Sequence, residues 1–184
     1  MPSVSVRLVD PETEQELPLS SEKEGELRVQ GPTVFKQYWH RIEASQDAFD
    51  SQGWFKTGDI AQFSNAKQSF RIRGRASADI LKTGGYKLSA LDIERVLLLH
   101  PQIQECAVFG IPDEKWGQRI AAVLRCKEPT MSSSEDLRPR LTDFLQHELA
   151  NYSVPREFHV VQAIPKNAMG KINKKGLAKA YGAH

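Results

Sequence analysis

The hydrophobic pattern of the chain changes near Gly74–Arg75, and this change restricts the folds that the chain can adopt. Before it, apolar and polar residues alternate in short runs. Such runs occupy residues 4–9, 26–30, 60–64 and 69–73, separated by Gly-, Pro- and Asn-containing turns. Alternation at a period of two is typical of strands with one buried face. The first part of the chain is therefore predicted to be rich in β-structure.

After this point, strand-like runs are mixed with helical apolar patterns. The predicted elements are a short strand at 79–82, a helix from Ser89 to His100, strands at 105–109 and 118–126, a helix along 137–149, a strand at 158–164 and a helix at 173–180. Strands covered by helices form a compact layered domain. We therefore expect an α+β protein, with a β-rich part over residues 1–75 and a smaller α+β domain over residues 76–184.

Local signals set some of the expected boundaries. Ser89 is a good helix N-cap, and Asp92 follows it three residues later. Pro139 lies early in the second helical pattern, so we expect that helix to begin near Arg138. Residues 127–134 are rich in serine and predict a surface linker.

Composition excludes several classes of protein. The chain has 184 residues and a net charge of +2, which is too small to indicate a nucleic-acid partner. No apolar run is long enough to span a membrane, and no targeting segment follows Met1. The five histidines lack metal-ligand spacing, so no metal site is expected among these residues. Cys106 and Cys126 lie in strand-like runs and are expected to be free thiols in a reducing compartment, with the cytoplasm as the default location.

Three segments carry candidate chemistry. Asp59 follows a Thr57–Gly58 turn and could accept hydrogen bonds from vicinal hydroxyls, although the segment is also an ordinary turn signature. Arg75 could bind an anion or be a plain surface arginine. Gly84–Gly85 could let a thin ligand pass close to the backbone or form a tight turn.

The third segment is residues 165–175, where Lys171 directly follows Gly170 on a loop before a Lys-rich helix. A glycine allows close backbone approach to a ligand. A lysine ammonium is a mobile point charge that suits phosphate or charge developing in a reaction. The alternative is a basic, solvated tail.

The order and spacing of four segments carry a resemblance to a known family. They are Gly-Glu-Leu-Arg-Val-Gln-Gly-Pro at 25–32, Gly-Trp-Phe-Lys-Thr-Gly-Asp at 53–59, Gly-Arg and Asp-Ile-Leu-Lys-Thr-Gly-Gly-Tyr-Lys within 74–94, and Pro-Lys-Asn-Ala-Met-Gly-Lys-Ile at 165–172. The chain resembles the C-terminal third of the acyl-adenylate-forming superfamily, which includes the AMP-binding acyl-CoA synthetases. Within it, residues 82–90 and 116–119 look most like the malonyl-CoA synthetase branch.

The resemblance implies an ATP-dependent acid–CoA ligase of fatty acid metabolism that forms an acyl-adenylate and then an acyl-CoA thioester. It implies that Asp59 holds the ribose hydroxyls of ATP or AMP and that Arg75 contacts the same nucleotide. Lys171 would be catalytic in the first step. Lys82, Gly84 and Gly85 would face the adenylate and line the coenzyme A passage after the small, mobile domain swivels.

Two features depart from the family pattern. The usual pivot position holds Ser77, and one extra residue lies before Lys82, so the hinge could be Ser77, Ala78 or Asp79. The phosphate loop and the Mg²⁺ ligands are not found in residues 1–58, which implies that they lie upstream in a missing N-terminal large domain. The chain alone is then expected to be inactive. Malonate as the substrate acid and a mitochondrial location follow only from the resemblance.

Two alternatives remain. The chain could be a truncated, non-catalytic module that binds coenzyme A or nucleotide, or that regulates a full-length synthetase. The basic C-terminal helix, with the lysines of residues 165–184, could also dock on an anionic membrane or on nucleic acid, although no aromatic series for base stacking accompanies these lysines.

Overall fold

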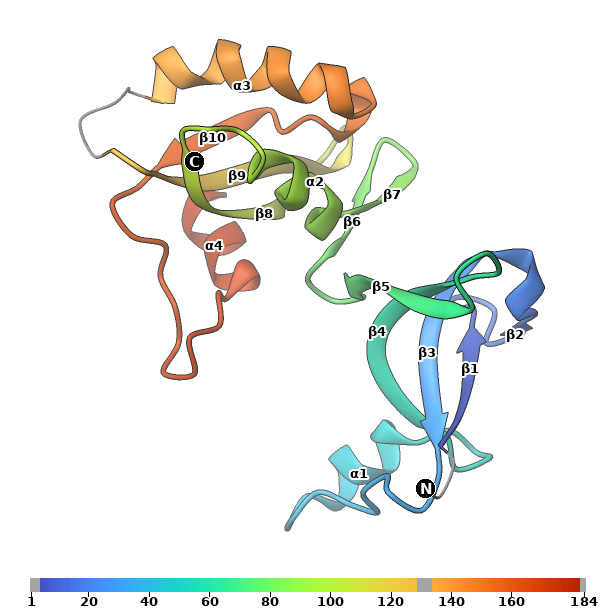
Figure 1. Ribbon diagram of the computed structural model, residues 1–184. Coiled ribbons are helices and arrows are strands. Elements are labelled where there is room, and N and C mark those ends of the chain that lie inside the picture. The colour runs from blue at the N-terminus through green and yellow to red at the C-terminus, as the bar shows by residue number, and fades with distance from the viewer. Residues whose placement is uncertain (1–3, 129–133, 183–184) are drawn as a thin grey trace. The chain divides into compact units, whose positions relative to one another are not determined.

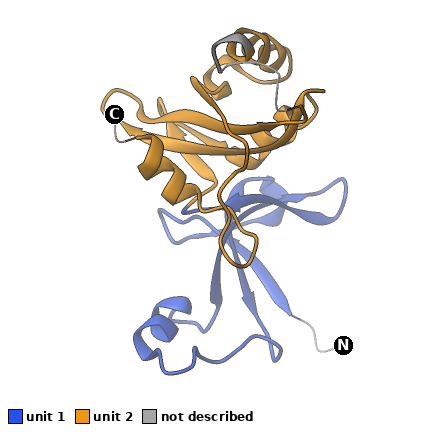
Figure 2. Cartoon of the chain, turned by 90° about the vertical axis from the view of Figure 1, so that its left-hand side faces the viewer, with its two compact units in different colours: residues 1–77 blue, residues 78–184 orange. Residues whose placement is uncertain are grey.

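The computed structural model describes residues 4–128 and 134–182 (Figure 1). The chain divides into two compact units, Met1–Ser77 and Ala78–His184 (Figure 2). The boundary at Ser77–Ala78 coincides with two of the three predicted hinge candidates. Each unit has its own sheet structure.

Unit 1 is built on a five-stranded antiparallel sheet in the order β2-β1-β3-β4-β5. Its elements are β1 (Ser5–Val9), β2 (Glu16–Leu17), the short 3-10 helix η1 (Leu19–Ser21), β3 (Glu24–Gln30), α1 (Ile42–Ala48), β4 (Phe55–Ser64) and β5 (Ser69–Arg75). The predicted strands are present. The short strand β2 lies inside the segment that was expected to be only a connection, because Leu17 pairs with Leu8 of β1.

The pairing of β3 with β4 is interrupted at one place. Glu26 lies opposite Ile60 and Arg28 lies opposite Lys56, so Leu27 faces the whole Thr57–Asp59 segment. This segment therefore forms a β-bulge, and Gly58 within it has a φ of 73°. Bulges re-aim side chains and are common beside functional sites. The sequence indicated a turn here, whereas the structure continues the strand through it.

Unit 2 contains a three-stranded sheet in the order β10-β9-β8 and a hairpin of β6 and β7. Its elements are β6 (Ile80–Thr83), β7 (Tyr86–Ser89), α2 (Ala90–Leu97), β8 (Ile103–Asp113), β9 (Gly117–Cys126), α3 (Ser134–Glu148), the 3-10 helix η2 (Asn151–Ser153), β10 (Glu157–Val160) and α4 (Lys174–Tyr181). Strand β10 pairs parallel with β9, and β8 pairs antiparallel with it.

Alternation along β8 and β9 divides the core of unit 2 into two layers. Val108 and Ala122 belong to the cluster formed with α2 and α3, whereas Phe109 and Val123 belong to the cluster that includes Leu177 of α4. Helix α3 consequently lies over one face of the sheet and α4 over the other (Figure 1). Both faces of these strands are buried, which explains their nearly continuous apolar sequence.

Some predicted boundaries are wrong. Strand β7 was not expected, since residues 86–89 pair with β6 only after the Gly84–Gly85 turn brings the two together. Helix α3 begins at Ser134 rather than near Arg138, and Pro139 lies inside it. The apolar side chains on its stripe, Leu137, Leu141 and Leu145, are buried and offset the lost hydrogen bond. Most of the predicted linker at 127–134 lies outside the described residues.

Candidate functional site

The structure brings Asp59 and Arg75 together. They are paired residues on β4 and β5, and the Arg75 Nε lies 2.9 Å from the Asp59 Oδ1. Arg75 also donates from Nη1 to the carbonyl oxygen of Thr57 at 2.8 Å. The bulge and the pairing register thus place a carboxylate and a guanidinium side by side, as a site for a hydroxyl-bearing anion requires.

Both side chains line an open groove of unit 1 with a volume of about 610 Å³. The Asp59 side chain is 32% exposed and the Arg75 side chain is 61% exposed, so a ligand can reach both. Other lining residues include Glu26, Tyr38 and Lys56. The groove combines acidic, basic and aromatic groups, which fits a nucleotide better than an apolar ligand.

A buried arginine, Arg28, bonds to Glu26, one of the residues that line this groove. Arg28 of β3 is 2% exposed and donates to carboxylates of Glu14, Glu26 and Asp50. Burial disfavours its charge, but the carboxylates of Glu14 and Glu26 outweigh this effect, so the pKa of Arg28 is raised. Its positive charge is therefore permanent.

Asp50 extends the same network to the loop before β4. Its Oδ1 accepts hydrogen bonds from the backbone N–H groups of Gln52 and Trp54, and its Oδ2 accepts from Arg7 and Arg28. Burial opposes the charged form of Asp50, but these hydrogen bonds outweigh it and lower its pKa. The carboxylate links β1 and β3 to the segment that leads to the bulge.

In unit 2, Lys82, Gly84 and Gly85 lie on one hairpin. Gly84 and Gly85 form the turn between β6 and β7, with φ angles of 55° and 84°. Two successive positive φ angles are typical of the tight hairpin turns that favour glycine. The Lys82 backbone N–H donates to Gln118 Oε1 at 2.7 Å, and Lys82 is an exposed residue.

Trp116 packs against this turn. The N–H of Gly84 donates to the carbonyl oxygen of Trp116, and a Cβ added at Gly84 would lie 3.3 Å from the indole ring. The guanidinium of Arg156 lies 4.6 Å from the centre of that ring. Beside it, Tyr86 and Tyr152 stack in parallel with their centroids 4.1 Å apart. The turn therefore presents flat aromatic surface, a cation and bare backbone together.

Lys171 lies on a separate tight loop. Asn167 closes this loop, since its Oδ1 accepts from the N–H groups of Met169 and Lys171 and its own N–H donates to the Lys171 carbonyl. Gly170 has a φ of 77°, and a Cβ placed there would meet nothing within 4 Å. Within the part of the chain that the structure describes, the exposed Lys171 ammonium has no carboxylate partner. The predicted glycine loop before a helix is confirmed.

The helix after this loop is fixed by a buried ion cluster. Lys174 Nζ lies 2.5 Å from Asp79 Oδ1 and 2.7 Å from Glu94 Oε1. Burial raises the pKa of Glu94, although Lys174 and the N–H of Val108 oppose the rise. The neighbouring Cys106 is a free, buried thiol, and burial raises its pKa to about 12. Such a thiol is unreactive at neutral pH.

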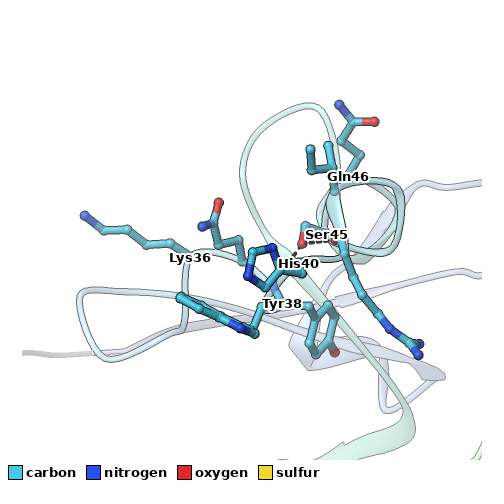
Figure 3. Close-up of a pocket in the computed structure, with 9 residues that line it drawn as sticks. Lys36, Tyr38, His40, Ser45 and Gln46 are labelled. Carbon is cyan, nitrogen blue, oxygen red and sulfur yellow. Dashed lines mark hydrogen bonds between the residues drawn. The ribbon is translucent and has the colours of Figure 1, made fainter.

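Unit 1 also has a second hollow, which is separate from the predicted site residues. Figure 3 shows a second hollow of unit 1, about 550 Å³ in volume, lined by residues 36–42, 45 and 46. None of the predicted site residues lines it. Among residues 4–128 and 134–182, no group of acidic, histidine and cysteine side chains could hold a metal, and no helix has the length and apolarity to cross a membrane.

Comparison with known proteins identifies the family of the domain in unit 2. Residues 92–171 match the family of the AMP-binding enzyme C-terminal domain. This part of the chain is therefore the C-terminal domain of the AMP-binding enzymes. The predicted resemblance to this superfamily is confirmed.

The individual relatives are more specific. The mitochondrial malonate–CoA ligase of Mus musculus is 52% identical over 158 residues, which cover 86% of this chain and 26% of the relative. The Homo sapiens enzyme of the same name is 48% identical over 160 residues, covering 87% and 27%. ATP-bound MatB from Rhodopseudomonas palustris is 31% identical, with a TM-score of 0.85 over 100% of this chain and 35% of that one. The chain therefore spans about a quarter of the length of its curated relatives.

Sequence reasoning missed three contributors to the site. Arg28 alternates with apolar residues in the sequence, which does not show that the Asp50 segment contacts it. Trp116 belongs to a sequence motif at 116–119, but its contact with Gly84 depends on tertiary packing. Lys174 lies in a Lys-rich segment, and no local signal distinguishes it from the exposed lysines, because its partners Asp79 and Glu94 are distant in sequence.

Proposed function

We propose that this chain forms the C-terminal part of an ATP-dependent acid–CoA ligase that uses malonate, and that residues 1–184 alone are inactive. The pairing of Asp59 with Arg75 in an exposed groove carries this proposal. The names of the mouse and human relatives support malonate and a mitochondrial location. We expect Mg²⁺ to be held by residues that are not in this chain.

In the first step, a carboxylate oxygen of the acid attacks the α-phosphorus of ATP, and the bond from that phosphorus to the bridging oxygen breaks to release pyrophosphate. Asp59 accepts hydrogen bonds from the ribose hydroxyls, and Arg75 pairs with the nucleotide. The ammonium of Lys171, on its exposed loop, neutralises charge that grows at the α-phosphoryl group. A cation without a carboxylate partner suits this role, because no existing ion pair has to break.

In the second step, the thiolate of coenzyme A attacks the acyl carbon and AMP leaves. The thiol proton is lost to solvent before the attack. We assign the thiol passage to the Gly84–Gly85 turn, where added side chains would either meet Trp116 or fill open space. Lys82, two residues before Gly84, lies on the same hairpin and faces the reaction in this step.

The two steps require different residues of unit 2, so we propose a pivot between them. Asp79 is held inside unit 2 by Lys174, and its carbonyl accepts from the N–H of Ala90. That leaves Ser77 and Ala78, at the boundary of the two compact units, as the better pivot. Domain rotation about a few junction residues is a common way to assemble one site twice.

The first experiment measures the mass of the native polypeptide by immunoblot with an antibody against residues 137–182. A band several-fold heavier than 20.7 kDa supports the proposal, and that protein is then assayed with malonate, ATP and coenzyme A. A band only near 20.7 kDa favours the binding or regulatory module instead.

The assay then tests Lys171. We expect Lys171→Ala to lower malonyl-adenylate formation by about 100-fold, because a charge at the developing phosphoryl anion is lost. Thioester formation from supplied malonyl-adenylate is expected to stay near the wild-type rate. Lys175→Ala removes an exposed charge from the next helix and is the matched control. A Lys171→Ala protein that forms adenylate normally would refute the assigned role.

A further inference from the structure

The bulge that carries Asp59 has an anchor in the neighbouring strand. Oε1 of Glu26 accepts a hydrogen bond from the Gly58 backbone N–H at 3.2 Å. The N–H of Asp59 bonds instead to the Thr57 hydroxyl, which in turn donates to the Leu27 carbonyl. Since a bulge interrupts ladder pairing, its N–H groups need such side-chain partners.

Glu26 is itself held in one orientation. Its Oε2 accepts from Arg28 Nε at 2.9 Å, and its side chain is only 13% exposed. The Arg28 side chain is 3% exposed and is fixed by the carboxylates of Glu14 and Asp50 as well. A carboxylate clamped on one oxygen by a buried guanidinium presents its other oxygen in a defined position.

Resting on the proposed function, we infer that Glu26 is a positioning residue for the nucleotide site: it transmits the rigidity of Arg28 to Gly58 and so fixes the direction of Asp59. Three observations converge on this role. Glu26 lies at the register shift opposite the bulge, it bonds the residue directly before Asp59, and it lines the same groove as Asp59 and Arg75. Its two oxygens point to Arg28 and Gly58 rather than to a ligand, so it acts through Asp59.

The matched control lies two residues away on the same strand. Glu24 forms an ion pair with Arg73 at 2.7 Å, but it pairs opposite Gln62, away from the bulge. Loss of Glu24 removes a carboxylate and an ion pair from β3 without removing a contact to Gly58. A merely structural role for Glu26 predicts a loss of stability without a selective rise in the KM for ATP.

The experiment compares Glu26→Ala, Glu26→Gln and Glu24→Ala in the native polypeptide. We expect Glu26→Ala to raise the KM for ATP about tenfold while kcat changes less than about threefold, since ribose binding is weakened before the chemical step. The glutamine variant keeps an acceptor oxygen for Gly58 and is expected to recover part of the loss. Glu24→Ala is expected to stay within about twofold of wild type.

Amide hydrogen exchange at Gly58 supplies a readout that does not depend on activity. We expect faster exchange in Glu26→Ala and unchanged exchange in Glu24→Ala. Unchanged Gly58 exchange in Glu26→Ala, or an equal rise of the KM in both alanine variants, would overturn the inference. If Glu26→Ala fails to fold, Glu26→Met, which keeps the length of the side chain but has no oxygen to accept from Gly58, carries the same two measurements. An unchanged KM for ATP in Asp59→Asn would instead overturn the nucleotide site of the proposed function, and Gly58 exchange would still decide the role of Glu26.

Discussion

At the scale of single residues, unit 1 buries charge beside the groove that Asp59 and Arg75 line. Arg28 is nearly inaccessible, yet three carboxylates surround it. Removal of one partner from such a cluster leaves buried charge without compensation, which is more destabilising than the net strength of any one pair. The cluster is therefore sensitive to both substitution and pH.

Asp50 gives the pH prediction. Its pKa in the folded state lies below the ordinary value of 3.8, so it contributes stability above that value, and the contribution is lost as the pH falls through the lowered pKa. We expect Asp50→Asn to reduce the free energy of unfolding by about 1–3 kcal/mol at pH 7. In urea titrations the variant and wild-type values should converge below pH ~4.

The control for Asp50 is Asp47→Asn, an exposed acid nearby in the sequence. It is expected to change stability by less than about 0.5 kcal/mol at either pH. A deficit of Asp50→Asn that stays constant down to pH ~3 would contradict the assignment, because a protonated Asp50 no longer contributes charge.

At the scale of elements, side-chain contacts hold both the loop that carries Lys171 and the helix that follows it. Asn167 shapes the loop, Asn173 caps α4 by accepting from the Gly176 N–H, and Lys174 ties the first turn of that helix to Asp79 and Glu94. The helix is short, so its position depends on these contacts more than on intrinsic helix stability.

Lys174→Met tests whether the ion cluster of Lys174, Asp79 and Glu94 stabilises the fold. The substitution leaves the Asp79 and Glu94 carboxylates, with side chains 12% and 14% exposed, without their shared cation. We expect a loss of about 3–5 kcal/mol in the free energy of unfolding, measured in urea. Lys175→Met is the control and should lose less than about 0.5 kcal/mol. Adding Glu94→Gln to Lys174→Met should recover part of the loss, and a further loss would argue against the cluster.

The β6–β7 hairpin allows a matched pair of glycine substitutions. Alanine at Gly84 or Gly85 requires an unfavourable positive φ, which costs about 1–2 kcal/mol. Only Gly84→Ala also presses its Cβ against Trp116, at 3.3 Å, whereas Gly85→Ala meets open space. We therefore expect Gly84→Ala to be the less stable variant in thermal unfolding. Equal losses would show that Trp116 does not restrict the turn.

At the scale of the whole molecule, the chain passes from one compact unit to the other at Ser77–Ala78. The proposed reaction needs Lys171 in one step and the Gly84–Gly85 hairpin in the next. The chain between the units must then change its backbone angles during each catalytic cycle. A residue that restricts those angles is expected to separate the two steps.

Ser77→Pro applies that restriction, since proline fixes φ near −65°. We expect malonyl-adenylate formation to stay within about threefold of wild type, whereas thioester formation falls by about tenfold or more. Both half-reactions are measured on the native polypeptide. Ser77→Ala preserves backbone freedom and should leave both rates unchanged. Equal loss of the two half-reactions in Ser77→Pro would refute the pivot.

The sequence alone predicted the fold class and most elements, because alternation and helical periodicity report which side chains are buried. Ser89 was identified as an N-cap, and its hydroxyl does accept from the Asp92 N–H. The resemblance carried by local motifs also predicts roles for Asp59, Arg75, Gly84–Gly85 and Lys171, and these roles stay predictions.

Tertiary structure decided what local patterns do not encode. The β3–β4 register made Thr57–Asp59 a bulge instead of a turn, and the β4–β5 register set Asp59 against Arg75. Burial of Arg28 and Lys174 depends on carboxylates from distant segments, so neither could be told from an exposed cation by its neighbours in sequence. Local motifs indicate candidate residues, but long-range pairing fixes their positions, because strand register and ion pairs join residues far apart along the chain.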